Sequence, residues 1–507
     1  MRRQSAKLVM AVVASGILNW FSQCVAFGGS GVPLDKVGAG PVATANVESV
    51  PSDGRPRVIV TSDGEIDDEC SMVRFLLCAN EFDVEAIVTS SSQYHWQGHR
   101  WAGDDWVDKY LDAYAQVYPN LVKHDPRYPA PEYLRARTLL GNVKAEGEMD
   151  EVTPGSQYIV KVLLDEADDR PVWLQAWGGM NTIARGLKTI EQEHPEKIAY
   201  VARKIRFFFI WEQDSTYQDY IRQHWARYGI LTIISDQFEA IAYRWKDILP
   251  GELHKYFEAG WMKEHILEGH GPLCALYKAH KAGDKGFEDG DFRSEGDSPA
   301  FLHNIVTGLR NMESPDWGGW GGRYVRVREN TWLDPVPVEG YVYPEGRWYS
   351  STSWGRAMTR KGATSATDRQ YKEYFKPIWR WVEAIQNDLA ARADWCVKPY
   401  QQANHPPRVR LAHDRDLNAR AGQTVRLSAE GSTDPDGNGL RYRWWQYHEA
   451  DTYGGIVEIR DSGQKEAWFV VPEDAMAKQT IHVVCEVTDD GRPPLTRYQR
   501  VVVTVVP

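Results

Sequence analysis

Short runs of almost wholly apolar residues, each followed by a helix-like stretch, constrain the fold of this chain most strongly. Such runs occupy residues 57–61, 84–90, 171–177, 205–211 and 230–235. A strand that is apolar along its whole length is buried on both faces, and strands that alternate with helices indicate a parallel sheet with right-handed crossovers. We therefore predict an α/β domain with a mostly parallel sheet and flanking helices.

A cluster of carboxylates follows the first run, where ligands of a parallel sheet gather beyond the carboxyl ends of the strands. The string reads Asp63-Gly64-Glu65-Ile66-Asp67-Asp68. At an effective dielectric of about 20, two unit charges roughly 4 Å apart repel by about 4 kcal/mol. The cluster therefore needs a cation, a shared proton or a helix N-terminus. The simplest alternative is that Asp67 and Asp68 only cap the helix that follows.

Composition narrows the class of ligand. The chain has 507 residues and a formal net charge of −11, without an extended basic stripe, which argues against a nucleic-acid partner. Its 21 Trp and 25 Tyr residues offer flat faces of the kind on which sugar rings stack. Residues 269–349 are irregular and rich in Gly, Trp and Asp, and we expect Trp317 and Trp320 in this stretch to bind a carbohydrate.

The first 55 residues are typical of an exported protein. A basic start and an apolar core precede a small-residue site that ends at Ala26. We predict a signal peptide over residues 1–26 and a flexible leader over 27–55, which makes the protein secreted or periplasmic. No other stretch is long and apolar enough to span a membrane. The pattern leaves the oligomeric state open.

A change of pattern after Tyr400 marks a second domain. The predicted strands lie at 409–411, 424–428, 440–445, 467–471, 480–487 and 497–505. Short strands separated by turns such as Asp434-Pro435-Asp436-Gly437 are typical of an immunoglobulin-like β-sandwich. We divide the chain into an α/β domain over 56–400 and an independently folding sandwich over 401–507. The acidic turns suit calcium, although Asp and Gly form such turns without a metal.

Three motifs in the α/β domain resemble those of the inosine–uridine-preferring nucleoside hydrolases. They are the acidic string from Asp63 to Asp68, Gly178-Gly179-Met180-Asn181-Thr182-Ile183-Ala184 and Asp297-Ser298-Pro299. The sandwich resembles the polycystic-kidney-disease and cadherin-like modules of secreted glycan-active enzymes. Together with residues 317–324, the fuller resemblance is to the cellulose-binding nucleoside-hydrolase-like family, and it covers nearly the whole mature chain.

This resemblance implies a calcium site next to a sugar site. Carried over by position, Asp63 would ligate Ca²⁺ and help to activate the attacking water, and Asp67 would hold sugar hydroxyls. Asp68, Asp297 and the main-chain carbonyl of Trp177 would complete the protein's share of the calcium ligands. Such an all-oxygen set suits a hard cation far better than zinc.

Other positions match the family less closely. Gln93 stands where the family has a substrate-binding Asn, and Asp214 lies in the segment expected to contact the sugar. Gly64-Glu65 replaces the family's Pro-Gly, and Gly296 replaces the His that assists departure of the base in some members. We take these departures to favour a glycan or glycoside over a free nucleoside. The candidate proton donors are His95, His99 and His303.

Three functions remain open on these grounds. The first is an exported calcium-dependent glycosyl hydrolase that acts on a plant-type glycan or glycoside. The second is a non-catalytic cellulose- or carbohydrate-binding protein, and the third is a nucleoside N-ribohydrolase. A phosphatase of the haloacid dehalogenase type is excluded, because its nucleophile would stand two residues before Asp63, at Thr61.

Overall fold

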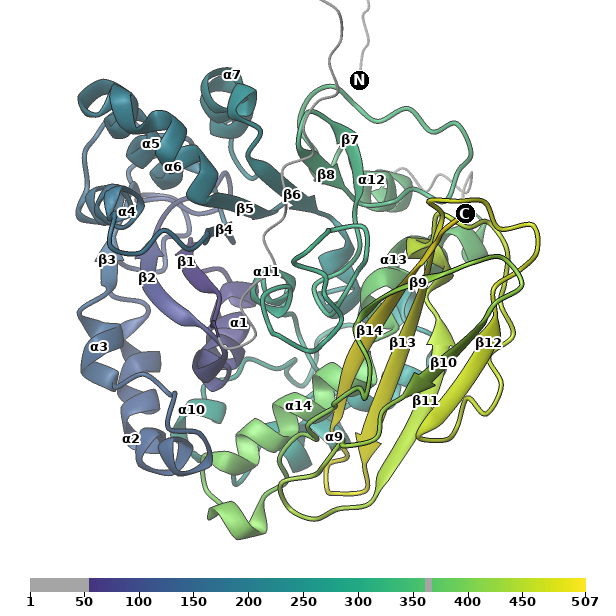
Figure 1. Cartoon of the computed structure of the whole chain (residues 1–507). Helices are drawn as coiled ribbons and strands as arrows, with labels where there is room; N and C mark the ends of the chain where they lie inside the picture. Colours follow the sequence, from purple (N-terminus) through teal and green to yellow (C-terminus); the bar gives the residue numbers. More distant parts are fainter. Residues whose placement is uncertain (1–53, 361–366) are drawn as a thin grey trace, which may run out of the picture. The chain divides into compact units, whose positions relative to one another are not determined.

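The computed structural model of this chain describes residues 54–360 and 367–507, so the predicted signal peptide lies outside the described residues. The α/β domain is built on an eight-stranded sheet in the order β3-β2-β1-β4-β5-β6-β8-β7 (Figure 1). Its strands are β1 (Arg57–Ser62), β2 (Asp83–Thr89), β3 (Thr138–Leu140), β4 (Val172–Ala176), β5 (Ile205–Ile210), β6 (Leu231–Ser235), β7 (Val325–Arg328) and β8 (Thr331–Leu333). Only the β7–β8 pair is antiparallel. The predicted mostly parallel sheet is confirmed.

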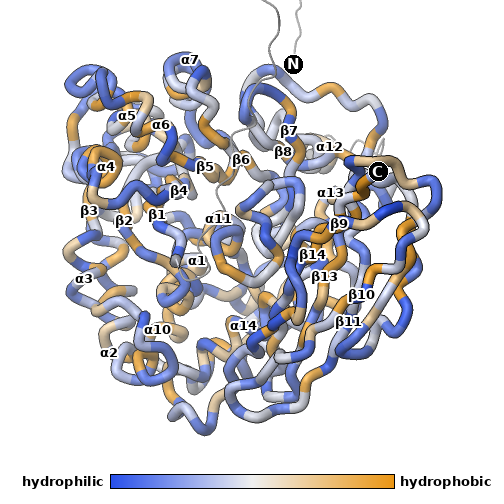
Figure 2. Tube along the Cα trace, in the orientation of Figure 1, coloured by the Kyte–Doolittle hydropathy of each residue, from blue (hydrophilic) through white to orange (hydrophobic). Residues whose placement is uncertain are grey.

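Helices cover both faces of this sheet. α4, α5 and α6 gather on one side, and α1, α11 and α14 on the other (Figure 1). These helices carry both hydrophobic and hydrophilic residues (Figure 2), as expected for helices with one face against a sheet. The helices are α1 (Ile66–Leu77), α2 (Asp108–His124), α3 (Pro131–Arg135), α4 (Pro154–Leu164), α5 (Asn181–Glu193), α6 (Ile198–Lys204), α7 (Arg222–Trp225), α8 (Trp245–Ile248), α9 (Ala259–Met262), α10 (Gly271–Cys274), α11 (Ser298–Leu302), α12 (Trp354–Arg360), α13 (Asp368–Trp379) and α14 (Val382–Trp395).

The path of the chain across the sheet reverses between β1 and β4. From β1 the chain moves outward to β2 and β3, whereas from β4 it moves the opposite way to β5 and β6. Open α/β sheets bind their ligands in the crevice beyond the carboxyl ends of the strands at such a reversal. Asp63 directly follows β1 and Trp177 directly follows β4, so the topology itself brings these two positions together.

Helix α1 begins inside the acidic string. The Glu65 N–H donates to Asp68 Oδ2 at 3.2 Å, and three acidic residues occupy the first turn, where the helix dipole favours negative charge. Asp68 is nevertheless only 1% exposed. Asp68 therefore caps helix α1 and, as a buried carboxylate, also needs a compensating charge or proton.

The C-terminal region is all β. Two sheets, β10-β12 and β11-β13-β14-β9, enclose a hydrophobic core of their own. The strands are β9 (Asp416–Ala419), β10 (Thr424–Ser428), β11 (Leu440–Gln446), β12 (Glu466–Val470), β13 (Thr480–Asp489) and β14 (Thr496–Val505). The stretch 409–411 is not a strand, and the edge strand β9 was missed because its sequence, Asp-Leu-Asn-Ala, is half polar. Asp434 Oδ1 accepts the N–H groups of Asp436 and Asn438, both at 2.9 Å, so this acidic turn is held by its own side chain.

The sandwich packs intimately against the α/β domain. Tyr447 and Tyr498 join the hydrophobic core of that domain. Arg500 is fully buried, and its guanidinium donates to the carbonyl oxygens of Leu309 at 2.7 Å and Trp317 at 2.6 Å. Buried bonds of this kind are costly to break singly, so the junction is a continuous packed interface. Independent folding of residues 401–507 remains a prediction.

Two chain-wide features bear on the environment of the protein. The five cysteines within the described residues are all buried and unbridged, consistent with an odd number that leaves at least one thiol free. Among the helices in the described part of the chain, none has the length and apolar character that a bilayer crossing requires.

Candidate functional site

The segments after β1 and β4 meet at the reversal of the sheet. The Trp177 N–H donates to the carbonyl oxygen of Thr61 at 2.9 Å. A Cβ at Gly178 would lie 2.9 Å from the Asp63 side chain, closer than real Cβ contacts allow. The glycine therefore lets the chain after β4 pass directly against the Asp63 carboxylate.

Three buried carboxylates gather at this point. Asp63, Asp68 and Asp297 are each 1% exposed, and side-chain oxygens of Asp67, Asp68 and Asp297 lie within 4.8 Å of one another. Ser62 donates its hydroxyl to Asp68. Oδ2 of Asp63 and Oδ2 of Asp297 accept no hydrogen bond from any described residue. Charges buried so close together need protons or a cation to compensate them.

The electrostatics divide these carboxyls into two kinds. Burial, reinforced by the charges of Asp297 and Asp63, raises the pKa of Asp68 well above its usual range. Burial, with the charges of Asp67 and Asp63, does the same to the pKa of Asp297. Burial also opposes ionisation of Asp63, but its neighbours His95 and Asp68 outweigh it and lower the pKa of Asp63. Burial and the neighbouring charges thus favour the protonated forms of Asp68 and Asp297, whereas the neighbours of Asp63 favour its charged form.

Asp67 and Glu65 lie at the more open side of the cluster. Tyr243 donates its hydroxyl to Asp67 Oδ1 at 3.3 Å, a contact that the sequence did not predict. Burial and the charge of Asp63 raise the pKa of Asp67 to about 6. Burial, with the charges of Asp67 and Asp63, raises the pKa of Glu65 to about 9, although a third of the Glu65 side chain is exposed.

The loop after β2 closes over the acidic string. Gly64 has φ +77°, and a Cβ there would lie 2.7 Å from the Ala102 Cβ, so only glycine fits. His95 Nδ1 lies 3.7 Å from Asp63 Oδ2 and 3.6 Å from Glu65 Oε2. Gln93 is anchored by its N–H, and its side-chain amide nitrogen has no partner among the described residues. His95 thus reaches the carboxylate cluster, and Gln93 lies in the same loop after β2.

Gln213 and Asp214 follow β5 and act structurally. Gln213 Nε2 donates to the Trp177 carbonyl at 2.5 Å, which the sequence did not predict. The Asp214 carboxylate accepts the N–H of Asn181 at 3.0 Å and the N–H of Thr216 at 2.9 Å. The structure therefore places Asp214 as a cap on the first turn of α5, with its oxygens already in use, and does not aim it at a ligand.

The predicted aromatic platform is not exposed. Trp320 is 1% exposed and lies beneath the Arg497 guanidinium, 5.3 Å from the ring centroid. Trp317 packs against the sandwich, with its ring 5.0 Å from that of His482. Trp320 is therefore not available to stack on a sugar, whereas the Trp317 ring is half-buried against the sandwich. Pattern alone does not distinguish a glycan platform from an interdomain core.

The remaining histidines occupy two different environments. His303 is fully buried among aromatic rings, and burial lowers its pKa to about 3, so it is a core residue. His99 is exposed and stacks on Trp96 with ring centroids 4.3 Å apart. Of the three candidate proton donors, only His95 contacts the carboxylates.

The absence of a His before Asp297 has a steric reason. A Cβ at Gly296 would lie 2.5 Å from Asp67 Oδ2 and 3.3 Å from the Phe238 ring. The space that a side chain would occupy is thus filled by the Asp67 carboxylate. The Asp67 carboxylate can therefore occupy this position only because residue 296 is a glycine.

The donor set at the cluster fits a hard cation. Asp63, Asp68 and Asp297 offer oxygens only, and two of those oxygens lack a partner among the described residues. A carbonyl oxygen has two lone pairs, so the Trp177 carbonyl keeps one free beside its bond from Gln213. Ca²⁺ takes six to eight oxygens, which leaves positions for water or sugar hydroxyls.

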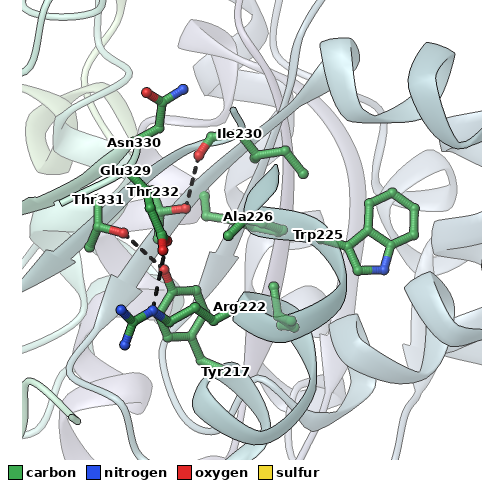
Figure 3. Close-up of a pocket in the computed structure, with 11 residues that line it drawn as sticks. Tyr217, Arg222, Trp225, Ala226, Ile230, Thr232, Glu329, Asn330 and Thr331 are labelled. Atoms are coloured by element: carbon green, nitrogen blue, oxygen red, sulfur yellow. Dashed lines mark hydrogen bonds and ion pairs between the residues drawn. The ribbon is translucent and has the colours of Figure 1, made fainter. Parts of the chain in front are cut away.

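A separate cavity lies on the far side of the same domain. It is lined by Tyr217 and Arg222 from the segment after β5 and by Ile230, Thr232 and Thr331 from the sheet (Figure 3). Its volume is about 10 Å³, which is space for about one water molecule. This cavity contains none of the carboxylates of the cluster and is too small for a substrate.

Comparison with known families agrees with the geometry. A model described as cellulose-binding Sde182, nucleoside hydrolase-like domain, matches residues 57–324. A second, described as cellulose-binding protein Sde0182, C-terminal domain, matches residues 424–505. The chain belongs to this Sde182 family. Both the predicted fold class and the predicted family are confirmed.

Solved structures support the same assignment. A nucleoside hydrolase-related hypothetical protein from Saccharophagus degradans, described as associated with carbohydrate metabolism, is 31% identical with a TM-score of 0.69 and covers 89% of this chain and 100% of its own. A plant nucleoside hydrolase is 13% identical with a TM-score of 0.29, over 57% of this chain and 90% of its own, too remote to bear on function. No curated protein matches the chain.

Proposed function

We propose that this Sde182-family protein is an exported calcium-dependent glycosyl hydrolase that acts on a glycan or glycoside. The observation that carries the proposal is the burial of Asp63, Asp68 and Asp297 at the reversal of the sheet, with unpartnered oxygens on two of them. Three crowded carboxylates are costly for a protein that has no use for a cation. Their oxygen-only chemistry favours Ca²⁺.

Each residue of the cluster has its own role in the proposed hydrolysis. A bound Ca²⁺ would acidify and orient a water molecule for attack at an anomeric carbon. The bond from that carbon to the leaving oxygen breaks as the water attacks, and the leaving oxygen takes a proton from solvent at the open side of the cluster. Asp63, whose pKa is lowered, is the carboxylate that accepts the proton of this water. Asp67 is ionised above its pKa of about 6 and is open enough to hold sugar hydroxyls. The carboxylates also stabilise the oxocarbenium-like charge that develops on the sugar.

Two observations favour a glycan or glycoside over a free nucleoside. The family and its S. degradans member are described in terms of cellulose binding and carbohydrate metabolism. Gly296 leaves no side chain beside Asp297 to protonate a departing base, and His303 is buried in the core. The export pattern of residues 1–26 would place the protein, secreted or periplasmic, where polymeric sugars occur.

A release screen tests this proposal directly. The purified protein is assayed with Ca²⁺ and with EGTA against plant-type oligosaccharides, aryl glycosides and nucleosides. Asp63→Asn should reduce turnover by about 10²–10⁴-fold, the usual contribution of a general base. Asp105→Asn, at an exposed position of the loop after β2, is the matched control and should leave turnover within about twofold. Unchanged turnover in Asp63→Asn would contradict the assignment of Asp63 as the catalytic base. Hydrolysis of nucleosides alone would make the protein an N-ribohydrolase.

Carbohydrate binding without turnover is the second candidate, and a groove between helix α14 and the sandwich favours it. The groove has a volume of about 360 Å³, within the roughly 300–1,000 Å³ of typical ligand sites. Trp381 and Asn387 line one wall, and Arg443, Glu486 and Tyr498 line the other. The last three are cross-strand neighbours on β11, β13 and β14. The rings of Trp381 and Tyr498 are almost fully buried, so the amide and charged groups would make most of the contacts to a sugar.

The groove is tested by binding to cellulose and soluble cello-oligosaccharides. Arg443 is well exposed and pairs with Glu486 at 3.5 Å, so Arg443→Ala should cost little stability. It should weaken oligosaccharide binding several-fold, whereas Arg426→Ala, an exposed arginine on the opposite sheet, should not. Equal binding by both variants would exclude the groove as the binding site.

A further inference from the structure

We propose that Asp63, Glu65 and His95 form a second cation site, which takes Zn²⁺ or a similar first-row divalent metal. This site goes beyond the proposed function and shares only Asp63 with the proposed calcium ligands. It combines Glu65, which stands in the segment where this chain departs from the family's Pro-Gly, with His95 of the loop after β2.

The separations of the three side chains match a coordination shell. His95 Nδ1 lies 3.7 Å from Asp63 Oδ2 and 3.6 Å from Glu65 Oε2. One ligand atom from each residue lies within 4.8 Å of the other two. Both measured separations exceed an ordinary N–H···O bond. Ligand atoms of a tetrahedral zinc, bonded at about 2.0–2.2 Å, are about 3.3–3.6 Å apart. Shifts of a few tenths of an ångström therefore bring the two His95 separations to those of a bound ion, and the partly exposed Glu65 side chain can close the third separation by rotation.

Two of the three ligand atoms are buried without a partner. Asp63 is 1% exposed and His95 is 9% exposed. Neither Asp63 Oδ2 nor His95 Nδ1 has a hydrogen-bond partner among the described residues. Buried polar atoms left unsatisfied each cost about 1–3 kcal/mol, and these two face each other. A cation between them satisfies both at once; the competing arrangement is a protonated imidazole held between two carboxylates.

The local backbone fixes this arrangement. Gly64, with φ +77°, turns the chain so that Glu65 comes back beside Asp63. His95 stands in a tight turn, in which its carbonyl oxygen accepts the Ser92 N–H at 2.9 Å. Ser92 Oγ in turn accepts the Tyr94 N–H at 3.0 Å. The turn that carries His95 is thus held by its own hydrogen bonds, while the Glu65 side chain remains one-third exposed and gives an ion access.

The donor set selects the class of metal. An imidazole nitrogen suits zinc, iron, nickel or copper, whereas Ca²⁺ takes oxygen ligands. Three protein ligands that include one His and two carboxylates leave the fourth zinc position open, as in catalytic zinc sites. Asp63 is also one of the proposed calcium ligands. The second ion would therefore lie next to the first, as in two-metal sites.

Calorimetric titration of Zn²⁺ into the calcium-saturated protein tests the site. Saturation with Ca²⁺ occupies the oxygen-only cluster, and we expect one further Zn²⁺ per chain. Co²⁺ should bind the same site and give the visible absorption of a low-coordinate ion. His95→Ala should lose at least about 100-fold in Zn²⁺ affinity, more than the loss of an outer-shell partner costs. His99→Ala, an exposed histidine of the same loop, is the matched control and should bind as the wild type does.

Two further variants separate this site from the calcium site. Asp68→Asn removes a proposed calcium ligand and none of the zinc ligands, so Zn²⁺ binding should survive even where Ca²⁺ binding is lost. Glu65→Gln removes a partly exposed ligand, and it replaces His95→Ala as the test of Zn²⁺ binding if His95→Ala changes the thermal midpoint. A calcium-saturated wild type that takes up no Zn²⁺ or Co²⁺ would overturn the proposal. So would a well-folded His95→Ala variant that binds Zn²⁺ as tightly as the wild type.

Discussion

Replacing Asp68 by Asn should stabilise the calcium-free protein while removing its stabilisation by Ca²⁺. The pKa of Asp68 is raised by burial and by the charges of Asp297 and Asp63. A carboxyl whose folded pKa lies above its unfolded value stabilises nothing at neutral pH. The folded state loses stability as the pH rises from the unfolded pKa towards the folded one. Asn does not ionise, so the Asp68→Asn variant does not lose stability in this way as the pH rises.

The size of the effect is bounded by the pH interval. Above the unfolded pKa of 3.8, a group that stays protonated in the fold costs about 1.4 kcal/mol per pH unit, so the limit at pH 7 is about 4 kcal/mol. The substitution by Asn also removes one acceptor, because the Glu65 N–H donates to Asp68 Oδ2 in the wild type. The loss of this hydrogen bond costs about 1–2 kcal/mol. A net gain of about 2–3 kcal/mol remains. For a chain of this size that is about 2–3 °C in thermal midpoint.

The assay is thermal unfolding in EGTA and in Ca²⁺ between pH 4 and pH 8. In EGTA the advantage of Asp68→Asn should be absent near pH 4 and grow with pH. With Ca²⁺ at 100 times its dissociation constant, the wild type should gain about 2.7 kcal/mol and the variant should not. Asp388→Asn is the control. Burial opposes the charge of Asp388, but Arg392 and Arg497 lower its pKa to about 2. This variant should lose about 2 kcal/mol at pH 7, and the loss should shrink towards pH 2.

An Asp68→Asn variant that is less stable than the wild type in EGTA at every pH would refute the reasoning. It would mean that the Asp68 carboxylate is compensated within the fold. The opposite signs expected for Asp68 and Asp388 make the comparison independent of any general effect of Asp→Asn substitution.

Three further predictions concern the cluster and the interface. The pKa values of Asp68 and Asp297 are raised, so Ca²⁺ binding should release protons and the calcium affinity should fall as the pH falls. Calorimetry in two buffers of different ionisation enthalpy measures the proton release, and its pH dependence gives the affinity. Trp320→Ala should cost about 3–5 kcal/mol of stability without a change in Ca²⁺ affinity, and a thermal midpoint lowered by less than about 1 °C would show that the ring is not core. Arg500→Gln should leave buried carbonyls unpaired and expose the junction between the domains to limited proteolysis; a wild-type cleavage pattern would contradict this.

Sequence pattern predicted the parallel sheet well and placed Asp63 and Trp177 at neighbouring strand ends, for a physical reason. Apolar runs such as Ile205–Ile210 are buried on both faces, and a parallel sheet is the arrangement that buries them. The topology then makes the ends of β1 and β4 neighbours, so Asp63 and Trp177 had to meet. The family motifs added Asp297, which stands more than 200 residues from Asp63 and which no local pattern connects to it.

The failures arise where tertiary packing decides. Trp320 has the sequence surroundings of a loop aromatic, but Arg497 of the sandwich covers it. Asp214 stands at a strand end like a ligand, yet its oxygens cap α5. Tyr243, which reaches Asp67 from the segment after β6, has no signal in the sequence, since a lone tyrosine in an irregular stretch resembles many others.

The two departures from the nucleoside hydrolase motif both lie close to Asp67, and their effects combine. A side chain at position 296 would displace the Asp67 carboxylate, which stands 2.5 Å from where a Cβ would be. Glu65 adds a carboxylate whose Oε2 lies 3.6 Å from His95 Nδ1. The side of the site where a nucleoside hydrolase protonates its leaving group has therefore lost one histidine and gained a carboxylate next to another. Such an exchange keeps the carboxylates of the sugar end of the site and changes the groups that would lie beside a leaving group.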